Sequence, residues 1–140
     1  MKVCLVIATY TGSSCDTAID LSNVTSPYIG NTSLSTNFLT SQPSCTTSTA
    51  PELVFKHLVP SGYNITLQQT YNGYDSAIDL RYGGTCPGTT AVTCQDDEDL
   101  DQVFWVNTLG YDEWVYYVQS GYGSEAGQFA LTWNVTVAGM

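Results

Sequence analysis

The sequence predicts an all-β domain, specifically a jelly-roll-like β-sandwich of about eight strands with an extra N-terminal strand. First, β-branched and aromatic residues are plentiful, with 19 Thr and 10 Tyr among 140 residues, while Lys, Arg and Glu are scarce. Second, apolar and polar residues alternate over most of the chain. Third, glycine and proline turn signals recur at short intervals. Short strands joined by compact turns, without a convincing helix, are typical of a sandwich.

The strand patterns follow one another along the whole chain, and each is a short run rich in β-branched and aromatic residues. They are predicted at residues 3–10, 33–39, 52–58, 63–70, 75–82, 102–109, 113–119 and 127–137. Turn signals with a backbone reason in glycine or proline stand at 60–62, 72–73, 83–84, 110 and 121–123. No internal repeat or long linker interrupts the series, so one domain is expected.

The alternation is clearest in the last predicted strand. Its core face consists of Phe129, Leu131, Trp133 and Val135. Asn134 therefore points to the opposite, solvent face. In residues 63–68, Ile65 and Leu67 point one way and Asn64 the other. Both asparagines are thus expected on outer faces of the sandwich.

The charge balance excludes several classes of protein. The chain carries 3 Lys and Arg against 13 Asp and Glu, a formal net charge of −10. A surface with so few cations is poorly suited to nucleic acid or to an anionic membrane. A disordered acidic tail is excluded as well, because 43% of the residues are hydrophobic. No stretch approaches the roughly 18 apolar residues of a membrane span.

The five cysteines indicate disulfides and an oxidising compartment. There is no C-x-x-C pair and His57 is the only histidine, so a zinc site is disfavoured. Four sequons agree with a secreted protein, namely those at Asn23, Asn31, Asn64 and Asn134. The alternative for each sequon is an ordinary polar residue on an outer face. Residues 3–8 imitate a signal peptide but are too short, so we expect the export signal to lie upstream.

Several motifs, in order, resemble the bacterial pre-peptidase C-terminal (PPC-type) domain. They are Cys15-Asp-Thr-Ala-Ile-Asp-Leu21, Gly30-Asn-Thr32, Cys45 followed by Pro51-Glu-Leu-Val-Phe55, Ser61-Gly-Tyr-Asn-Ile-Thr-Leu67, Tyr74-Asp-Ser-Ala-Ile-Asp-Leu-Arg81, Cys86, Cys94-Gln-Asp-Asp97, Tyr116-Tyr-Val-Gln-Ser-Gly-Tyr122 and Gly127-Gln-Phe-Ala-Leu-Thr132. The resemblance implies a jelly-roll-like sandwich over residues 15–140, used as an accessory module of secreted proteins that sometimes binds collagen, glycans or calcium. It implies no catalytic residues.

The same resemblance implies a disulfide pairing. Cys86 would join Cys94 across a hairpin, and Cys15 would join Cys45. Cys4 is then left over, unpaired or available for a disulfide between subunits.

Residues 1–14 precede the part that resembles this family, and they are apolar on both faces of a strand. Val3, Leu5 and Ile7 lie on one face, and Cys4, Val6, Ala8 and Tyr10 lie on the other. Such a strand must be covered on both faces. It is expected either to pair within its own domain or to complete the sandwich of a neighbouring subunit by strand addition. The second case makes Val3, Leu5, Val6, Ile7 and Tyr10 an assembly strand.

The other candidate sites have weaker patterns. Asp96, Asp97, Asp99 and Asp101 form a candidate calcium site, although an EF-hand is excluded by Gln102 and Thr108 at required positions; a solvated acidic turn is the alternative. A glycosidase-like carboxylate pair has no predicted apolar pocket. His57 is expected to be a surface or packing residue. A sugar-stacking platform would draw on Trp105, Trp114, Tyr116, Tyr117 and Trp133, but Trp133 falls on the predicted core face and at least half of the others are expected there too.

Two functions are therefore expected from the sequence. The first is a structural subunit of an extracellular, N-glycosylated filament or surface layer, assembled head-to-tail through the N-terminal strand. The second is a carbohydrate- or matrix-binding accessory module of a larger secreted protein. An enzyme is not expected, and no cofactor is required beyond covalent glycans and the candidate calcium.

Overall fold

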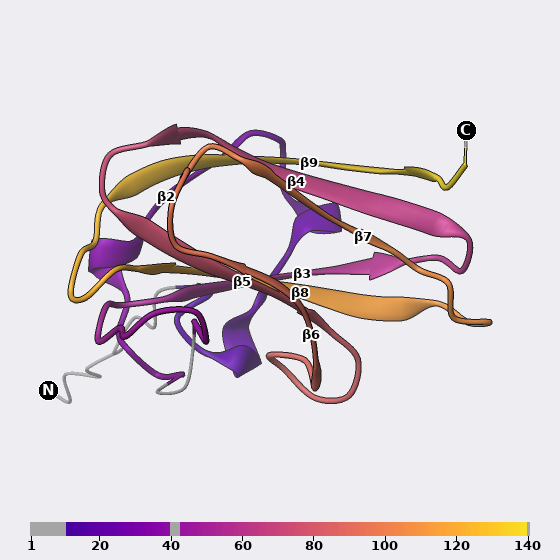
Figure 1. Ribbon diagram of the computed structural model, residues 1–140, viewed down its shortest axis with the longest axis horizontal. Coiled ribbons are helices and arrows are strands. Elements are labelled where there is room, and N and C mark those ends of the chain that lie inside the picture. Colours follow the sequence, from indigo (N-terminus) through magenta and orange to yellow (C-terminus); the bar gives the residue numbers. More distant parts are fainter. Residues whose placement is uncertain (1–10, 40–42, 140) are drawn as a thin grey trace, which may run out of the picture.

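The computed structural model describes residues 11–39 and 43–139, and these form a two-layer β-sandwich (Figure 1). Nine strands are present in this part of the chain: β1 Ile19–Asp20, β2 Tyr28–Asn31, β3 Leu53–Val59, β4 Tyr63–Asn72, β5 Ser76–Tyr82, β6 Thr90–Gln95, β7 Gln102–Val106, β8 Glu113–Gly121 and β9 Gln128–Val137. Three short 3-10 helices accompany them, η1 Cys15–Thr17, η2 Leu21–Asn23 and η3 Thr32–Leu34. The predicted all-β sandwich is confirmed.

The two sheets have the strand orders β1-β3-β8-β5-β6 and β2-β9-β4-β7. All neighbours are antiparallel except β1 and β3. Tyr28 of β2 packs edge-on against Phe55 of β3, with ring centroids 5.1 Å apart. Tyr82 of β5 stacks on Trp105 of β7 at 4.5 Å. The sandwich therefore has one edge at β1 and β2 and the opposite edge at β6 and β7.

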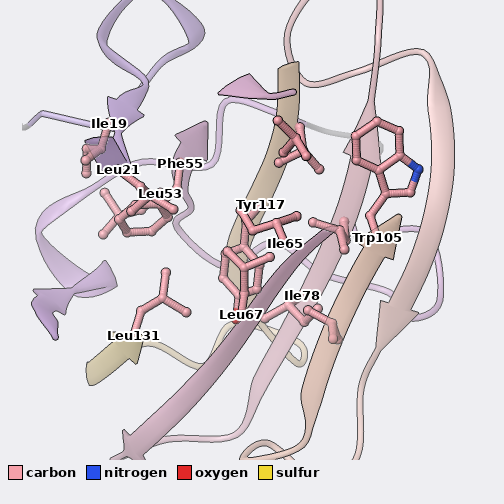
Figure 2. Close-up of a cluster of buried hydrophobic side chains, with 14 of the residues drawn as sticks. Ile19, Leu21, Leu53, Phe55, Ile65, Leu67, Ile78, Trp105, Tyr117 and Leu131 are labelled. Carbon is pink, nitrogen blue, oxygen red and sulfur yellow. The ribbon is translucent and has the colours of Figure 1, made fainter. Parts of the chain in front are cut away.

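The core lies between the sheets and is built by the inward rows of the alternating strands (Figure 2). It includes Leu53, Phe55, Ile65, Leu67, Leu80, Tyr117, Phe129 and Leu131, all less than 4% exposed. Phe55 is its aromatic centre, since it contacts the rings of Tyr28, Tyr117 and Phe129. Burial of these side chains supplies most of the stabilising free energy of such a domain.

The outer face of the five-stranded sheet is covered as well. Val54, Tyr116 and Val118 point outward and are buried under Phe38 and Leu39. Ala18, Cys86 and Trp114 complete this second cluster. β3 and β8 are therefore apolar on both faces, which explains their nearly continuous hydrophobic sequences.

Six of the predicted strands correspond to β3, β4, β5, β7, β8 and β9 within a few residues. The strand predicted at 33–39 is wrong. Asn31 Oδ1 accepts the Ser33 N–H at 3.0 Å, and Ser35 N–H bonds Thr32 O at 2.9 Å, so the chain turns there as η3. Only Thr36 forms an isolated bridge, to Glu52. The strand predicted at 3–10 lies outside the described residues.

Two disulfides connect the four cysteines of the domain, but not in the pairing that the family resemblance implies. Cys15 is bonded to Cys86 and Cys45 to Cys94. The implied pairing is wrong because Cys86 does not lie across a hairpin from Cys94. Cys94 is opposite Asp79 on β5, whereas Cys86 belongs to the β5–β6 loop, which packs on the outer apolar cluster. Cys4 lies outside the described residues.

Gly121, the last residue of β8, has no room for a side chain. A Cβ atom there would lie 1.9 Å from the backbone oxygen of Glu125. We expect Gly121→Ala to lower the free energy of unfolding by about 1–3 kcal/mol, because backbone must move to relieve the clash. Gly110→Ala is the matched control, since a Cβ there meets no described atom within 4 Å. Urea unfolding checks both variants, and equal midpoints would contradict this account of the turn.

Candidate functional site

The outer face of the four-stranded sheet brings two of the sequons together. β4 and β9 pair so that Asn64 lies opposite Thr136 and Thr66 lies opposite Asn134. Thr136 Oγ1 donates to Asn64 Oδ1 at 2.6 Å. The neighbouring Ile65 is fully buried, while Asn134 is exposed and Asn64 half-buried, as the alternation predicts. One polar face thus carries two candidate acceptors for glycans.

The other two sequons lie near the β1–β2 edge. Asn23 is exposed at the end of η2. Asn31 ends β2 and is half-buried, and its Oδ1 accepts hydrogen bonds from both the N–H and the hydroxyl of Ser33, the hydroxyl at 2.6 Å. The asparagine and the hydroxyl residue of this sequon are therefore held in one local turn.

A shallow polar depression of about 230 Å³ lies beside the paired sequons. Its lining comes from β4, β7 and β9, and consists of Thr66, Leu67, Gln68, Gln102, Thr132, Trp133 and Asn134. Because Asn134 is part of the lining, a glycan on this asparagine would occupy the same space as a bound ligand.

The aromatic residues considered for a sugar-stacking platform do not form one, and Trp133 packs against the core as expected. Trp105 is 8% exposed and stacks on Tyr82 between the sheets, and Tyr117 is in the core. Trp114 lies on the outer face of the five-stranded sheet, where Lys56 Nζ is 4.9 Å from its ring centroid. Trp133 belongs to the other sheet. The aromatic side chains are thus divided between the core and the outer face of the five-stranded sheet.

The acidic turn connects β6 to β7 and is anchored to a buried polar network. Gln69 Nε2 donates to the backbone oxygen of Asp99 at 2.8 Å and to Ser76 Oγ at 3.0 Å. Gln119 Nε2 donates to Gln69 Oε1 at 2.9 Å and to Tyr74 Oη at 2.8 Å. These amides lie between the two sheets, so the turn is fixed from inside the sandwich.

Burial and neighbouring like charges both disfavour ionisation of carboxyl groups in this turn. Burial, followed by the charges of Asp97 and Asp75, raises the pKa of Asp96. Burial also raises the pKa of Asp99. Among the described residues, no group of three or more His, Cys, Asp or Glu side chains is arranged to hold a metal ion. Calcium at Asp96, Asp97, Asp99 and Asp101 stays a prediction.

Two buried carboxylates on the outer face of the five-stranded sheet were not predicted from the sequence. Glu52 is fully buried, and its Oε1 accepts the Leu39 N–H at 3.2 Å. Its Oε2 has no hydrogen-bond partner among the described residues. Burial raises the pKa of Glu52 to about 8. Asp79 is 1% exposed beside Ser44 and Arg81, and burial raises its pKa to about 6.

These carboxylates could not be predicted from the sequence, because their burial depends on residues that are distant in the chain. Glu52 looks like the polar start of a strand, but the chain returns to it: Thr36 pairs with its backbone, and Leu39 N–H donates to its carboxylate. Protonation of Glu52 at neutral pH follows from this burial. His57 is half-buried, with Nδ1 2.7 Å from the backbone oxygen of Leu58.

The edge at β6 and β7 contains a groove of about 420 Å³ with a mainly apolar lining. It is lined by Val92, Thr93 and Gln95 of β6 and by all five residues of β7, Gln102, Val103, Phe104, Trp105 and Val106. Within the described residues, β6 pairs only with β5 and β7 only with β4. The continuous apolar run 103–106 is the sequence signal that could have indicated this groove.

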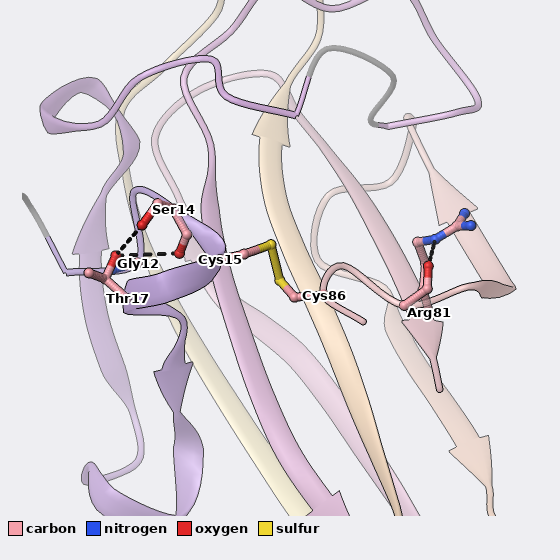
Figure 3. Close-up of a disulfide and its surroundings, with 7 residues drawn as sticks. Gly12, Ser14, Cys15, Thr17, Arg81 and Cys86 are labelled. Atoms are coloured by element: carbon pink, nitrogen blue, oxygen red, sulfur yellow. Dashed lines mark hydrogen bonds between the residues drawn. A yellow bond between two sulfur atoms is a disulfide. The ribbon is translucent and has the colours of Figure 1, made fainter. Parts of the chain in front are cut away.

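The opposite edge holds the junction to the N-terminal segment (Figure 3). Gly12 N–H bonds Thr17 O at 2.8 Å, and Val54 N–H bonds Gly12 O at 2.9 Å. Three residues later Cys15 is bonded to Cys86. The chain is therefore tied to β3 and to the β5–β6 loop where it enters the sandwich. The assembly residues Val3, Leu5, Val6, Ile7 and Tyr10 lie outside the described residues.

The fold and its cross-links define a disulfide-bonded all-β sandwich domain. Searches against protein-family models, curated proteins and solved structures found no match. The resemblance to the PPC-type domain is therefore still a prediction. No helix in residues 11–39 and 43–139 is long and apolar enough to cross a membrane.

Proposed function

We propose that the protein is a structural subunit of an extracellular, N-glycosylated filament or surface layer, joined to its neighbours by strand addition through residues 3–10. The observation that supports it best is the N-terminal junction. A segment that is apolar on both strand faces is attached, at one edge of the sandwich, to a site secured by backbone hydrogen bonds and by the Cys15–Cys86 disulfide. Covering both faces of this segment requires a partner sheet.

The positions of the sequons support the glycosylated character of this subunit. Asn64 and Asn134 lie on the outer face of the four-stranded sheet. Glycans there would project from the broad side of the sandwich, where Asn64 lies opposite Val106 of β7. With charged residues at only 11% of the chain, such glycans would also supply much of the surface hydration.

Electron microscopy of the secreted full chain tests the assembly. We expect filaments or sheets from the intact chain and single particles after deletion of residues 1–10, because the deletion removes the added strand. It leaves Gly12 and its bonds to the sandwich in place. Leu5→Asp with Ile7→Asp is a matched control that keeps the length of the segment and is expected to give single particles too. Monodisperse particles from the intact, secreted chain would refute the filament.

Intact mass before and after enzymatic glycan removal tests the sequons separately. We expect a mass decrease for the intact chain, and a smaller decrease for the variant that carries Asn64→Gln and Asn134→Gln, because two acceptors on one face are then lost. Thr70→Ala, on the same strand but outside any sequon, is the control. A mass that glycan removal leaves unchanged would contradict glycosylation.

A carbohydrate- or matrix-binding module is the second candidate, and the polar depression beside Asn134 favours it. The two candidates differ in what glycosylation of Asn134 does. A binding module requires an open depression, whereas the filament subunit tolerates a glycan there. The binding module would be favoured if the Asn134→Gln variant bound to a glycan array and the glycosylated chain did not.

A further inference from the structure

We propose that the groove at the β6–β7 edge is the acceptor for residues 3–10 of a second copy, which add to β7 as a new strand of the four-stranded sheet. This inference rests on the proposed function and assigns the surface that receives the donated segment. It follows from three features of the described residues: an unpaired strand edge, apolar side chains on both faces of that edge, and the place where the donor segment leaves the sandwich.

The edge of β7 is available for pairing. Within the described part of the chain its only strand partner is β4, so the N–H and C=O groups on its other side lack a ladder. An exposed edge of this kind is the usual template for strand addition. The groove beside it has a volume of about 420 Å³ and a mainly apolar lining.

Both faces of β7 are apolar, which is unusual for an edge strand. Val103 and Trp105 point into the sandwich and are 4% and 8% exposed. On the outer face Phe104 is 59% exposed, beside the half-buried Val106. A strand added here would insert one row of side chains into the groove, while its other row would lie beside Phe104.

The segment 3–10 has the pattern that such a site needs. One row holds Val3, Leu5 and Ile7, and the other holds Cys4, Val6, Ala8 and Tyr10. Eight extended residues span about 26 Å, enough to cover the five residues of β7. An ordinary edge strand with one polar row would leave Phe104 uncovered, so the two-sided segment is the matching occupant.

The other edges are less suitable. β1 has two residues, β2 contains Gly30 and the polar Asn31, and half of the residues of β6 are polar, namely Thr90, Thr93 and Gln95. Charge also favours β7. The acidic turn Asp96–Asp101 leads directly into it, and Lys2 immediately precedes the donor segment. An alignment parallel to β7 would place this cation beside the acidic turn.

The donor junction and the acceptor groove are on opposite edges of the sandwich. Gly12 bonds β3 and packs against Ile19 of β1, whereas β6 and β7 form the far edges of the two sheets. A contact between two different edges is heterologous. Repeated head-to-tail, it does not close and produces a filament.

Cysteine cross-linking of the full chain tests the assignment. Gln102→Cys and Phe104→Cys place thiols on the outer face of β7, and Ile29→Cys on β2 is the control at the opposite edge, where Ile29 is 68% exposed. The donor thiol is Cys4 or, in a Cys4→Ser background, Leu5→Cys, so that both rows of the segment are probed. After mild oxidation, non-reducing electrophoresis should show a ladder of multimers for the β7 variants, and at least tenfold less for Ile29→Cys.

A second pair of variants needs no cross-link. Phe104→Asp should reduce filament yield at least tenfold, and Ile29→Asp should not, since both residues are exposed and neither change disturbs the core. Near-ultraviolet circular dichroism confirms that both variants are folded.

The outcomes separate this inference from the proposed function. Filaments that persist in Phe104→Asp, or that cross-link through Ile29→Cys instead of β7, would refute the acceptor groove and leave the filament function intact. A cross-link within one chain would refute donation to a second copy. Absence of filaments from the unmodified chain would refute the proposed function itself.

Discussion

Replacement of Glu52 by glutamine is expected to remove a loss of stability that the protein otherwise shows between about pH 4.5 and pH 8. Burial raises the pKa of this carboxyl from 4.5 to about 8 in the folded state. The folded protein therefore binds a proton that the unfolded chain releases, and the free energy of unfolding falls as the pH rises through this window. Each pKa unit corresponds to about 1.4 kcal/mol, so the loss is several kcal/mol and at most about 5 kcal/mol.

Urea unfolding of the disulfide-bonded protein from pH 4 to pH 9 measures this effect. Asp79 also destabilises the folded protein as the pH rises, but most of its part of the loss has occurred by about pH 6. The charge of Arg81 partly offsets the effect of burial on the pKa of Asp79. Between pH 6 and pH 8 the loss of stability that Glu52→Gln removes is therefore expected to exceed the loss contributed by Asp79. The exposed Glu125 provides the control Glu125→Gln, which should leave the profile unchanged. A wild-type protein that becomes more stable between pH 6 and pH 8 would show that Glu52 is not buried in this way.

Removal of the Cys15–Cys86 disulfide by a double alanine substitution should lower the free energy of unfolding by about 2–4 kcal/mol. The bond closes a loop across a sequence separation of 71 residues, so its loss increases the entropy of the unfolded chain. Cys45–Cys94, with a separation of 49, is the matched comparison and should have a loop contribution of similar size.

Removal of one disulfide or the other should increase local opening in different regions of the protein. Only the loss of Cys15–Cys86 detaches the chain around Gly12 from the β5–β6 loop. Amide hydrogen exchange at residues 12–18 should therefore increase in that variant and stay nearly unchanged when Cys45 and Cys94 are replaced. Thermal unfolding within 1 °C of the wild type for both variants would contradict a stabilising role for the bonds.

The predictable part of the fold is the part in which local pattern and tertiary environment agree. β4 alternates apolar and polar side chains over residues 63–68 and β9 does so over most of its length, so the inner and outer faces of these segments could be assigned in advance. β6 could not, because Thr90–Gln95 does not alternate apolar and polar residues, and among the described residues it is held as a strand by its pairing with β5. For residues 33–39, the hydrogen bonds of Asn31 and Thr32 dominate over β-propensity.

The features of the candidate site also divide into those that could be predicted from the sequence and those that could not. The sequons at Asn64 and Asn134 were expected on outer faces, but their position opposite each other depends on strand register, which one sequence does not specify. Disulfide pairing likewise depends on which loops meet in space. The burial of Glu52 and the groove at β7 depend on neighbours that are distant in the chain.

The Cys15–Cys86 bond would have a mechanical consequence for the proposed filament under tension. Force that enters at Gly12 reaches Cys15 within three residues and can pass through the sulfur atoms to the loop that leads into β6. This route crosses the five-stranded sheet covalently, so the hydrogen bonds between β3, β8 and β5 need not be sheared in turn. A pulled filament would then separate between subunits, at the added strand, before any single subunit unravels.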